Sequence, residues 1–344
     1  MENETILLGM SGGVDSSYAA LLLKEAGYTV VGAVLKMSDA TDLDAAKKAC
    51  DALEIPLHVI DCAERFHEIV IGDFLSEYAK GRTPNPCVVC NREVKIAALC
   101  AFAEENGIGK IATGHYAKIR RDGEAGRFYL ERAADLTKDQ SYMLWRLTQE
   151  QLSMLCLPLA EAQKSQIKAD AASRRLPSAG LSESQEICFI PDNDHVSYIE
   201  RATGIFPHGK FLDEAGNVLG EHKGIIRYTI GQRKGLGVSL GHPMFVSAID
   251  AANNTVTLSD ERALFRTELS CSALNFQKLA PGDYDGLTLS AKIRYAAKPE
   301  EAIVCIRGDT ATVRFLRPVR AVTPGQSVVF YDGDDLCFGG FIDG

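Results

Sequence analysis

The chain has 344 residues, of which 46% are hydrophobic and 24% charged, and its formal net charge is −9. This length exceeds the usual size of one hydrophobic core, so two or three domains are expected. The acidic balance argues against a protein that binds polyanions over its whole surface. No apolar run reaches transmembrane length, and the N-terminus lacks the basic and apolar regions of a signal peptide, so a cytosolic protein without membrane contact is expected.

The first motif follows the first expected strand, where residues 7–17 read LLGMSGGVDSS. Gly12 and Gly13 permit backbone conformations that other residues avoid, and they let main-chain N–H groups approach a ligand. A helix expected at 16–26 would aim its unpaired N–H groups at an anion there. The serines add hydroxyl donors, and the carboxylate of Asp15 could hold Mg²⁺. The pattern predicts a phosphate-binding loop.

This loop differs from that of Walker-type proteins, because the chain has no GxxxxGK[ST] motif and therefore lacks the lysine that grips terminal phosphates. SGGVDSS resembles the PP-loop of the N-type ATP pyrophosphatases. The resemblance implies that a substrate oxygen attacks the α-phosphate of ATP and releases pyrophosphate. A glycine-rich turn without a ligand is the alternative, but a full SGGxDS motif directly after a strand is more specific than a glycine pair.

Short apolar runs alternate with helical patterns from residue 5 to about 190, which predicts a parallel sheet covered by helices on both faces. Strands are expected at 6–10, 28–36, 57–61 and 110–116, and helices at 16–26, 42–53, 63–80 and 91–106. The segment RTPNPCVVCN between two of these helices contains two prolines, so it is expected to be an exposed loop that carries two cysteines. A hairpin is expected around Asp122-Gly123, and Cys188 is expected on a short strand or its edge.

The sequence pattern changes beyond about residue 205, where glycines and short runs of alternating apolar and polar residues indicate a small β-rich module. Five alternating segments with turn residues between them follow from residue 271 onward, and they predict a compact β-barrel of about six strands. The expected fold class is therefore α/β. It consists of an N-terminal parallel-sheet PP-loop ATP pyrophosphatase domain at 1–204, a central β-rich domain at 205–270 and a C-terminal β-barrel domain at 271–344.

The chain has ten cysteines, which in a reducing compartment are more typical of buried thiols, metal ligands or nucleophiles than of disulfides. Seven of them lie within apolar patterns and are expected to pack as small core residues. Cys87 and Cys90 form a CxxC pair, which favours metal or redox chemistry. For Cys188 taken alone, a buried thiol is the simpler interpretation.

Eight segments together resemble the tRNA-specific 2-thiouridylases, the MnmA/TrmU family, in their order and spacing. They are GMSGGVDSS, GRTPNPCVVCN, ATGHYA, KDQSYML, ESQEICFIP, YTIGQRKGLG, KIRYAAKP and VTPGQSVVFY, and the match covers essentially the whole chain. The resemblance implies adenylation of O2 of the wobble uridine in tRNAs for Lys, Glu and Gln, followed by replacement of that oxygen with sulfur. It also implies ATP and Mg²⁺ as cofactors, and a persulfide carrier or sulfide as sulfur donor.

The same resemblance assigns roles to individual positions. Cys90 matches the nucleophile, Cys188 matches the persulfide-bearing cysteine, and Asp15 is assigned to catalysis. Nucleotide contacts fall on Gly9, Met10, Ser11, Gly12, Gly13, Val14, Asp15, Ser16, Leu35 and Gly114, where Leu35 replaces the family's usual methionine. Contacts with tRNA fall on Asn85, Pro86, Cys87, His115, Lys138, Asp139, Gln140, Arg294, Tyr295 and Gln326. The central domain and the basic stretches 222–234 and 292–320 would meet the RNA backbone.

Cys87 departs from the family pattern, in which many members have aspartate at this position. A third thiolate offers the ligand count of related tRNA thiolases, in which Cys87, Cys90 and Cys188 would hold a 4Fe–4S cluster with one open iron. A persulfide scheme needs only Cys90 and Cys188. Both schemes remain open, as do two other functions: another PP-loop ATP pyrophosphatase that amidates its substrate, and a tRNA- or metal-binding protein with a decayed ATP site.

Overall fold

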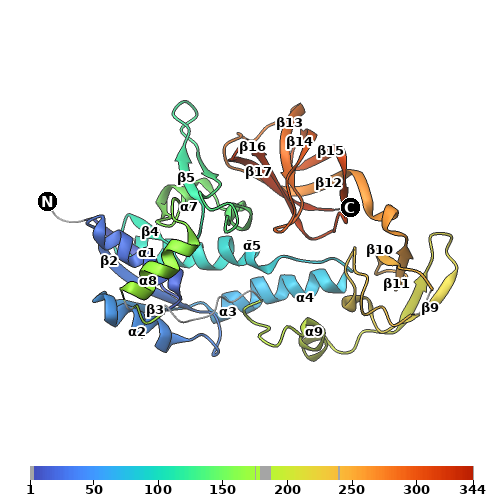
Figure 1. The fold of residues 1–344 in the computed structure, drawn as a ribbon, viewed down its shortest axis with the longest axis horizontal. Coiled ribbons are helices and arrows are strands. Elements are labelled where there is room, and N and C mark those ends of the chain that lie inside the picture. The colour runs from blue at the N-terminus through green and yellow to red at the C-terminus, as the bar shows by residue number, and fades with distance from the viewer. Residues whose placement is uncertain (1–3, 175, 179–186, 239–240, 344) are drawn as a thin grey trace.

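The computed structural model describes residues 4–174, 176–178, 187–238 and 241–343. Figure 1 shows a sheet domain near the N-terminus, a small β module beside α9, and a β-barrel that contains the C-terminus. Helices α4 and α5 extend from the sheet domain toward the other two parts. No helix in the described ranges is long and apolar enough to cross a membrane.

The N-terminal domain is built on a five-stranded parallel sheet of order β3-β2-β1-β4-β7, which confirms the expected doubly covered sheet. Its central strand β1 is buried because Ile6, Leu7 and Leu8 pack against helices on both faces. The strands are β1 (Thr5–Gly9), β2 (Thr29–Lys36), β3 (Leu57–Asp61), β4 (Lys110–Ala112) and β7 (Leu155–Cys156). The chain order reverses between β1 and β4, which is where ligands bind in such sheets.

The α-helices of the chain agree with most of the expected ranges. They are α1 (Val14–Glu25), α2 (Leu43–Leu53), α3 (Ala63–Arg65), α4 (Gly72–Ala79), α5 (Pro86–Cys90), α6 (Ala97–Glu105), α7 (Gln149–Met154), α8 (Lys164–Ser173) and α9 (His195–Thr203). Two π-helical segments, η1 (Phe66–Ile71) and η2 (Asn91–Ile96), join α3 to α4 and α5 to α6. Short 3-10 turns are η3 (Ser141–Leu144), η4 (Ile225–Arg227) and η5 (Glu261–Leu264).

The surroundings of the three cysteines differ from expectation. Residues 82–85 are irregular, as their prolines predict, but α5 begins at Pro86, so Cys87 and Cys90 lie on a helix and not in an exposed loop. Proline is tolerated at the first helical position because the N–H that it lacks has no partner there. Cys188 lies in a turn and not on a strand, since the Ile190 N–H donates to the Ile187 carbonyl at 2.8 Å. Residues 183–186 of this segment lie outside the described ranges.

The β-rich parts form two further sheets. The central module has a four-stranded sheet of order β10-β11-β8-β9, from β8 (Gly209–Leu212), β9 (Val218–His222), β10 (Phe245–Asp250) and β11 (Thr255–Ser259). The barrel consists of β12 (Phe265–Phe276), β13 (Tyr284–Lys292), β14 (Glu300–Arg307), β15 (Thr310–Arg320), β16 (Ser327–Asp332) and β17 (Asp335–Ile342). Pairing of β12 with β17 closes it, so the expected six-stranded barrel is confirmed. Strand β12 runs across position 271, where the third domain was expected to begin.

The barrel and the N-terminal domain share one sheet. The expected hairpin is present as β5 (Lys118–Arg121) and β6 (Phe128–Glu131), and β6 pairs with β17 of the barrel. Behind this pairing, Trp145 is fully buried and its indole N–H donates to the Ser327 hydroxyl at 2.9 Å. The Tyr142 hydroxyl donates to the Ser327 carbonyl at 2.9 Å. Two aromatic anchors from the first domain therefore fix the barrel in place.

We predict that Gly339→Ala destabilises this junction. A Cβ at Gly339 on β17 would lie 2.6 Å from the Trp145 ring, so the buried indole would have to shift. Overpacking of this kind costs about 1–3 kcal/mol. The midpoint of thermal unfolding should fall in Gly339→Ala and not in Gly123→Ala, whose new methyl group meets nothing within 4 Å. Equal midpoints in the two variants would contradict this account of the junction.

Candidate functional site

The glycine-rich loop joins β1 to α1 and is held by its own serines. The Ser11 hydroxyl lies 3.2 Å from that of Ser16, and the hydroxyls of Ser16 and Ser17 donate to the Gly13 carbonyl at 3.1 and 2.9 Å. Gly12 has a φ of +79°, and a Cβ there would lie 2.5 Å from the Ala45 backbone of α2. Only glycine fits this position, so the loop is fixed before any ligand arrives.

A second glycine brings the end of β4 against the same loop. A Cβ at Gly114 would lie 3.0 Å from the Asp15 carbonyl carbon and from the Ser16 backbone nitrogen. The structure thus brings Gly114 together with the loop residues 9–16, as the site prediction requires. Leu35 lies near the carboxyl end of the neighbouring strand β2, where its side chain is partly buried. The carboxyl ends of β1, β2 and β4 meet at this edge of the sheet.

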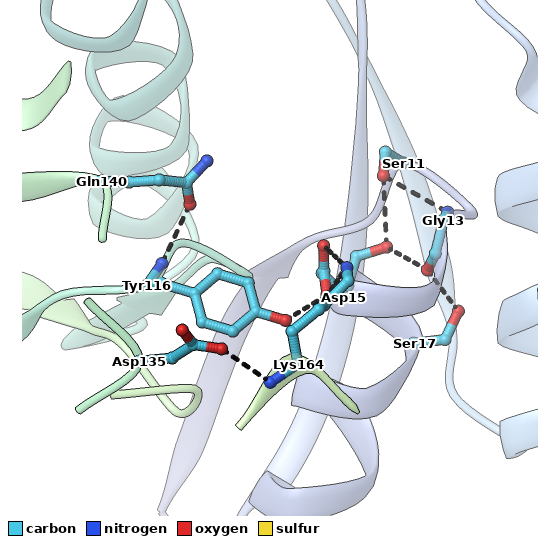
Figure 2. Close-up of polar contacts among 9 residues, drawn as sticks. Ser11, Gly13, Asp15, Ser17, Tyr116, Asp135, Gln140 and Lys164 are labelled. Atoms are coloured by element: carbon cyan, nitrogen blue, oxygen red, sulfur yellow. Dashed lines mark hydrogen bonds and ion pairs between the residues drawn. The ribbon is translucent and has the colours of Figure 1, made fainter. Parts of the chain in front are cut away.

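Asp15 is held by a lysine from a distant helix (Figure 2). The Lys164 ammonium, at the start of α8, donates to both carboxylate oxygens of Asp15 at 2.6 and 2.7 Å. The Tyr116 hydroxyl donates to the same carboxylate at 2.5 Å. Lys164 is 6% exposed, so this ion pair is largely shielded from water. In this arrangement the carboxylate is neutralised by protein, and it does not fit the predicted role of a magnesium ligand.

A second layer holds Tyr116 and Lys164 in position (Figure 2). Gln140 brackets the Tyr116 backbone: its N–H donates to the Tyr116 carbonyl at 2.7 Å, and its side-chain oxygen accepts the Tyr116 N–H at 3.0 Å. The Asp135 carboxylate accepts the Lys164 backbone N–H at 3.1 Å. Asp139 is 5% exposed and accepts the Ser141 hydroxyl at 2.8 Å. The side chain of Asp139 thus faces the interior of the domain. The sequence assigned Asp139 to a contact with tRNA, and that contact stays a prediction.

The three cysteines of interest lie near one another but differ in environment. Cys90 is 4% exposed, whereas Cys87 and Cys188 are exposed. Burial raises the pKa of the Cys90 thiol to about 12, and the neighbouring Cys188 and Cys87 add to that increase. Although Cys188 is exposed as a residue, the protein around its sulfur partly excludes water and raises the pKa of the thiol. At neutral pH both thiols are therefore protonated, although a thiolate is the reactive form.

Lys95 on η2 is the cation of this cluster. Burial lowers the pKa of Lys95, but the ionised forms of Cys90, Cys87 and Cys188 outweigh burial and raise it overall. Lys95 in turn favours the thiolate forms of Cys90 and Cys188. On its other side lies His115, whose pKa is lowered to about 3 by burial and by the Lys95 charge. His115 is therefore neutral at neutral pH, and its Nδ1 lies 2.8 Å from the Thr113 hydroxyl.

The cysteine cluster does not fit the iron–sulfur site offered by the sequence. Within the described ranges, no group of three or more His, Cys, Asp or Glu side chains could hold a metal ion. The Cys90 Sγ instead lies 3.9 Å from the Met37 thioether, in an apolar pocket that also contains Cys62 and Val94. An apolar pocket of this kind suits a protonated thiol better than a metal-bound thiolate.

The predicted tRNA-contacting residues fall in separate places. Tyr295 is 38% exposed and lies beside Tyr142, with the Lys292 ammonium 5.3 Å from its ring centre. Arg294 donates to the Arg320 carbonyl at 3.1 Å. Lys138 follows Asp135 in the loop that also carries Gln140. Gln326 lies in the barrel, and its side-chain amide donates to the carbonyls of Thr83 and Pro84. This contact brings Gln326 close to Asn85, the next residue in the chain.

Lys164 and Lys95 were missed by the sequence analysis. Lys164 is the first residue of α8 and lies 149 residues from Asp15 along the chain, so no local sequence pattern marks it as a partner of Asp15. Lys95 lies five residues after Cys90, on a segment expected to be helical. Neighbouring side chains on a regular helix are three or four residues apart, so a spacing of five does not mark this pair.

Three family models match successive parts of the chain: the tRNA methyl transferase HUP domain at residues 4–192, the tRNA methyl transferase PRC-barrel domain at 197–260, and the aminomethyltransferase beta-barrel domain at 266–342. The tRNA-specific 2-thiouridylase MnmA 1 of Caldanaerobacter subterraneus subsp. tengcongensis is 46% identical, over 99% of this chain and 98% of its own length. The tRNA-specific 2-thiouridylase MnmA of Acetivibrio thermocellus is 44% identical, over 99% of this chain and 100% of its own.

One similar solved structure is more distant in sequence. A 4-thiouridine synthetase in complex with RNA and bound ATP is 15% identical, over 58% of this chain and 50% of its own, with a TM-score of 0.35. A similarity at this level carries no argument about function.

We predict that Lys164→Met weakens ATP binding by about tenfold, which corresponds to about 1.4 kcal/mol. Without the lysine, the Asp15 carboxylate loses its counter-charge and repels the phosphates. Calorimetric titration with ATP measures the effect. Lys168→Met, one turn further along α8 at an exposed position, is the matched control and should bind ATP as the unchanged protein does. Equal affinities in the two variants would show that Lys164 serves only the fold.

Proposed function

Because this chain belongs to the family of tRNA-specific 2-thiouridylases, we propose that the glycine-rich loop and the α5 cysteines perform the two halves of one reaction. The chain is an ATP-using tRNA-uridine 2-sulfurtransferase, and its product is 2-thiouridine in tRNA. The observation that carries the division of labour is that the Lys95 charge acts both on the cysteines and on His115, which follows the Gly114 that packs against the loop. The first half activates the base, and the second half delivers sulfur.

Activation is needed because a uridine carbonyl oxygen is a poor leaving group. Attack of O2 on the α-phosphate of ATP forms an adenylated base and releases pyrophosphate. The N–H groups at the start of α1 and the hydroxyls of Ser11 and Ser16 can bind the phosphates there. Neutralisation of Asp15 by Lys164 removes a negative charge that would repel them. Magnesium bound to ATP would neutralise further charge on the phosphates.

We assign sulfur transfer to Cys188 and Cys90, the two cysteines that the motif resemblance points to. The terminal sulfur of a Cys188 persulfide bonds to C2 while the bond from C2 to the adenylated oxygen breaks, so AMP leaves. The Cys90 thiolate then attacks Sγ of Cys188, the persulfide S–S bond breaks, and its electron pair remains on the sulfur of the base. A thiol reductant must then reduce the Cys90–Cys188 disulfide, and a persulfide donor must reload Cys188.

Cys90 requires help to act as a nucleophile. Its thiol is buried and its pKa is raised to about 12, so little thiolate exists at neutral pH. Lys95 is the nearby cation that favours ionisation. Rearrangement of the 187–190 turn when tRNA binds would open the pocket around Cys90. Sulfur transfer would then begin only when the base is in place.

The substrate tRNAs proposed are those that read Lys, Glu and Gln codons, with the wobble uridine turned out of its loop to reach both halves of the site. Arg294, Tyr295 and the basic stretches supply phosphate contacts and a stacking surface. Asn85, Pro86, His115, Lys138, Gln140 and Gln326 stay predicted tRNA contacts from the resemblance. The enzyme is proposed to work in the cytoplasm, where thiols stay reduced.

We predict that tRNA with a wobble uridine triggers conversion of ATP to AMP and pyrophosphate. Product analysis with radiolabelled ATP measures this, and Asp15→Asn should abolish it because the Lys164 and Tyr116 contacts lose their charged partner. ADP and phosphate as products would contradict adenylation. Turnover with ammonia and without sulfur transfer would favour an amidating ligase. Tight tRNA binding with no ATP cleavage would favour a decayed ATP site.

We predict that Cys87→Ser retains activity when the protein is prepared in air and shows a reducible Cys90–Cys188 disulfide. The physical reason is that Cys87 is exposed and lies in no metal-competent group among the described residues. Iron and sulfide analysis after anaerobic purification, combined with activity, tests this. Loss of bound iron and activity together in Cys87→Ser would instead support a 4Fe–4S cluster on Cys87, Cys90 and Cys188.

A further inference from the structure

The three parts of the chain meet at the segment that leads into the cysteine helix. We define residues 81–85, between α4 and α5, as the strap. A Cβ at Gly81 would lie 2.7 Å from the Ile249 side chain of the central module, and the Thr83 hydroxyl lies 3.4 Å from that of Thr229 in the same module. On its other side the strap contacts the turn at 323–326 of the barrel.

The barrel holds the strap by its backbone. The Thr83 N–H donates to the Pro324 carbonyl at 2.9 Å. The Gln326 side-chain amide donates to the Thr83 carbonyl at 2.8 Å and to the Pro84 carbonyl at 3.3 Å. Gly325, with a φ of +88°, allows this approach, because a Cβ there would lie 3.1 Å from the Thr83 backbone. A side chain longer than glycine would push the turn and the strap apart.

The strap is also tied at its N-terminal end. The Arg82 guanidinium donates to Glu77 of α4 at 2.6 Å and to the Ile342 carbonyl of β17 at 3.1 Å. Ile342 in turn donates its N–H to the Gln326 carbonyl at 2.8 Å. The same short stretch of barrel therefore contacts three consecutive strap residues.

The strap transmits its position to the cysteines because it is stiff. Pro84 and Pro86 fix their own φ angles and restrict the residue before each of them. Pro86 is the first residue of α5, so the direction of the chain at Thr83 and Pro84 determines where the helix starts. Cys87 and Cys90 follow on that helix within one turn or so.

We propose that Gln326 is a positioning residue for sulfur transfer: by holding the Thr83 and Pro84 carbonyls it places α5, and with it Cys87 and Cys90, at the reaction site. This rests on the sulfur-transfer role proposed above for Cys90. The side-chain amide nitrogen of Gln326 donates to the strap. The side-chain oxygen is the hydrogen-bond acceptor of the same group, and it is the atom that an RNA donor could contact. Binding of tRNA to the barrel is thereby coupled to the position of the cysteine helix.

Gln326→Glu is the decisive variant, because it keeps the shape of the side chain but replaces the donor by a carboxylate that repels both carbonyls. Loss of one hydrogen bond of ordinary strength changes a local opening equilibrium by up to about tenfold. We therefore expect Cys90, which is 4% exposed, to be alkylated by iodoacetamide about tenfold faster in Gln326→Glu without tRNA or ATP. With saturating tRNA, the pyrophosphate burst that reports adenylation should persist while formation of AMP and 2-thiouridine falls, so that the two half-reactions uncouple.

Gln149→Glu is the matched control, since the Gln149 amide also donates to a backbone carbonyl at 2.8 Å, that of Phe128, away from the strap. It should leave Cys90 alkylation unchanged. Gln326→Lys retains a donor and should show the slow Cys90 alkylation of the unchanged protein. If Gln326→Glu does not fold, Gln326→Ala replaces it and should raise the Cys90 alkylation rate by a smaller factor. Equal alkylation rates in Gln326→Glu and Gln149→Glu would overturn the proposal. Because alkylation needs no turnover, failure of the proposed function would appear separately, as absence of thiolation by the unchanged protein.

Discussion

The ion pair between Lys164 and Asp15 is the interaction on which the nucleotide half of the site depends. It joins the first helix of the sheet domain to one of its last, and Tyr116 and Gln140 are fixed around it. Removal of the Asp15 charge would leave the buried Lys164 ammonium without compensation, which is more costly than loss of a surface pair. The motif carries no lysine of its own, and the lysine beside it comes from α8, where it pairs with the Asp15 carboxylate. The loop can therefore be short and rich in glycine and serine, because its charge balance is set from outside.

What could be predicted from the sequence was local or periodic. Gly12, Gly13 and the alternation of apolar runs specified the loop, the parallel sheet and the barrel, because backbone freedom and side-chain period act over a few residues. Lys164 could not be predicted as a partner of Asp15, since only the fold brings α8 to the start of α1. The same holds for Gln326, which was assigned to tRNA by resemblance and is found bonded to the strap. Pro86 was available to sequence reasoning as a helix start, and the exposed-loop prediction gave too much weight to the prolines as helix breakers.

The cysteine half of the site illustrates how burial limits chemistry. Cys90 shares an apolar pocket with Met37, Phe66 and Val94, and such surroundings favour the neutral thiol. Lys95 partly offsets this, while the exposed Cys87 and Cys188 are free of the pocket. In the proposed reaction, a buried nucleophile beside an accessible sulfur carrier would keep the two thiols from reacting prematurely, because the buried one would ionise only when its surroundings change.

The hairpin β5–β6 has a consequence for the order in which the molecule is made. Its strand β6 extends the barrel sheet through β17, and Tyr142 bonds to a residue 185 positions later in the chain. Contacts at such separation form late, since a long loop must close before they contribute. During synthesis the ribosome therefore releases a sheet domain whose hairpin and aromatic anchors have no partner until the final strands emerge. During that interval Trp145 and Tyr142 lack their barrel partners and would be apolar surface that a chaperone can bind. The last strands to be translated are therefore the ones that cover this surface and lower the tendency of the first domain to aggregate.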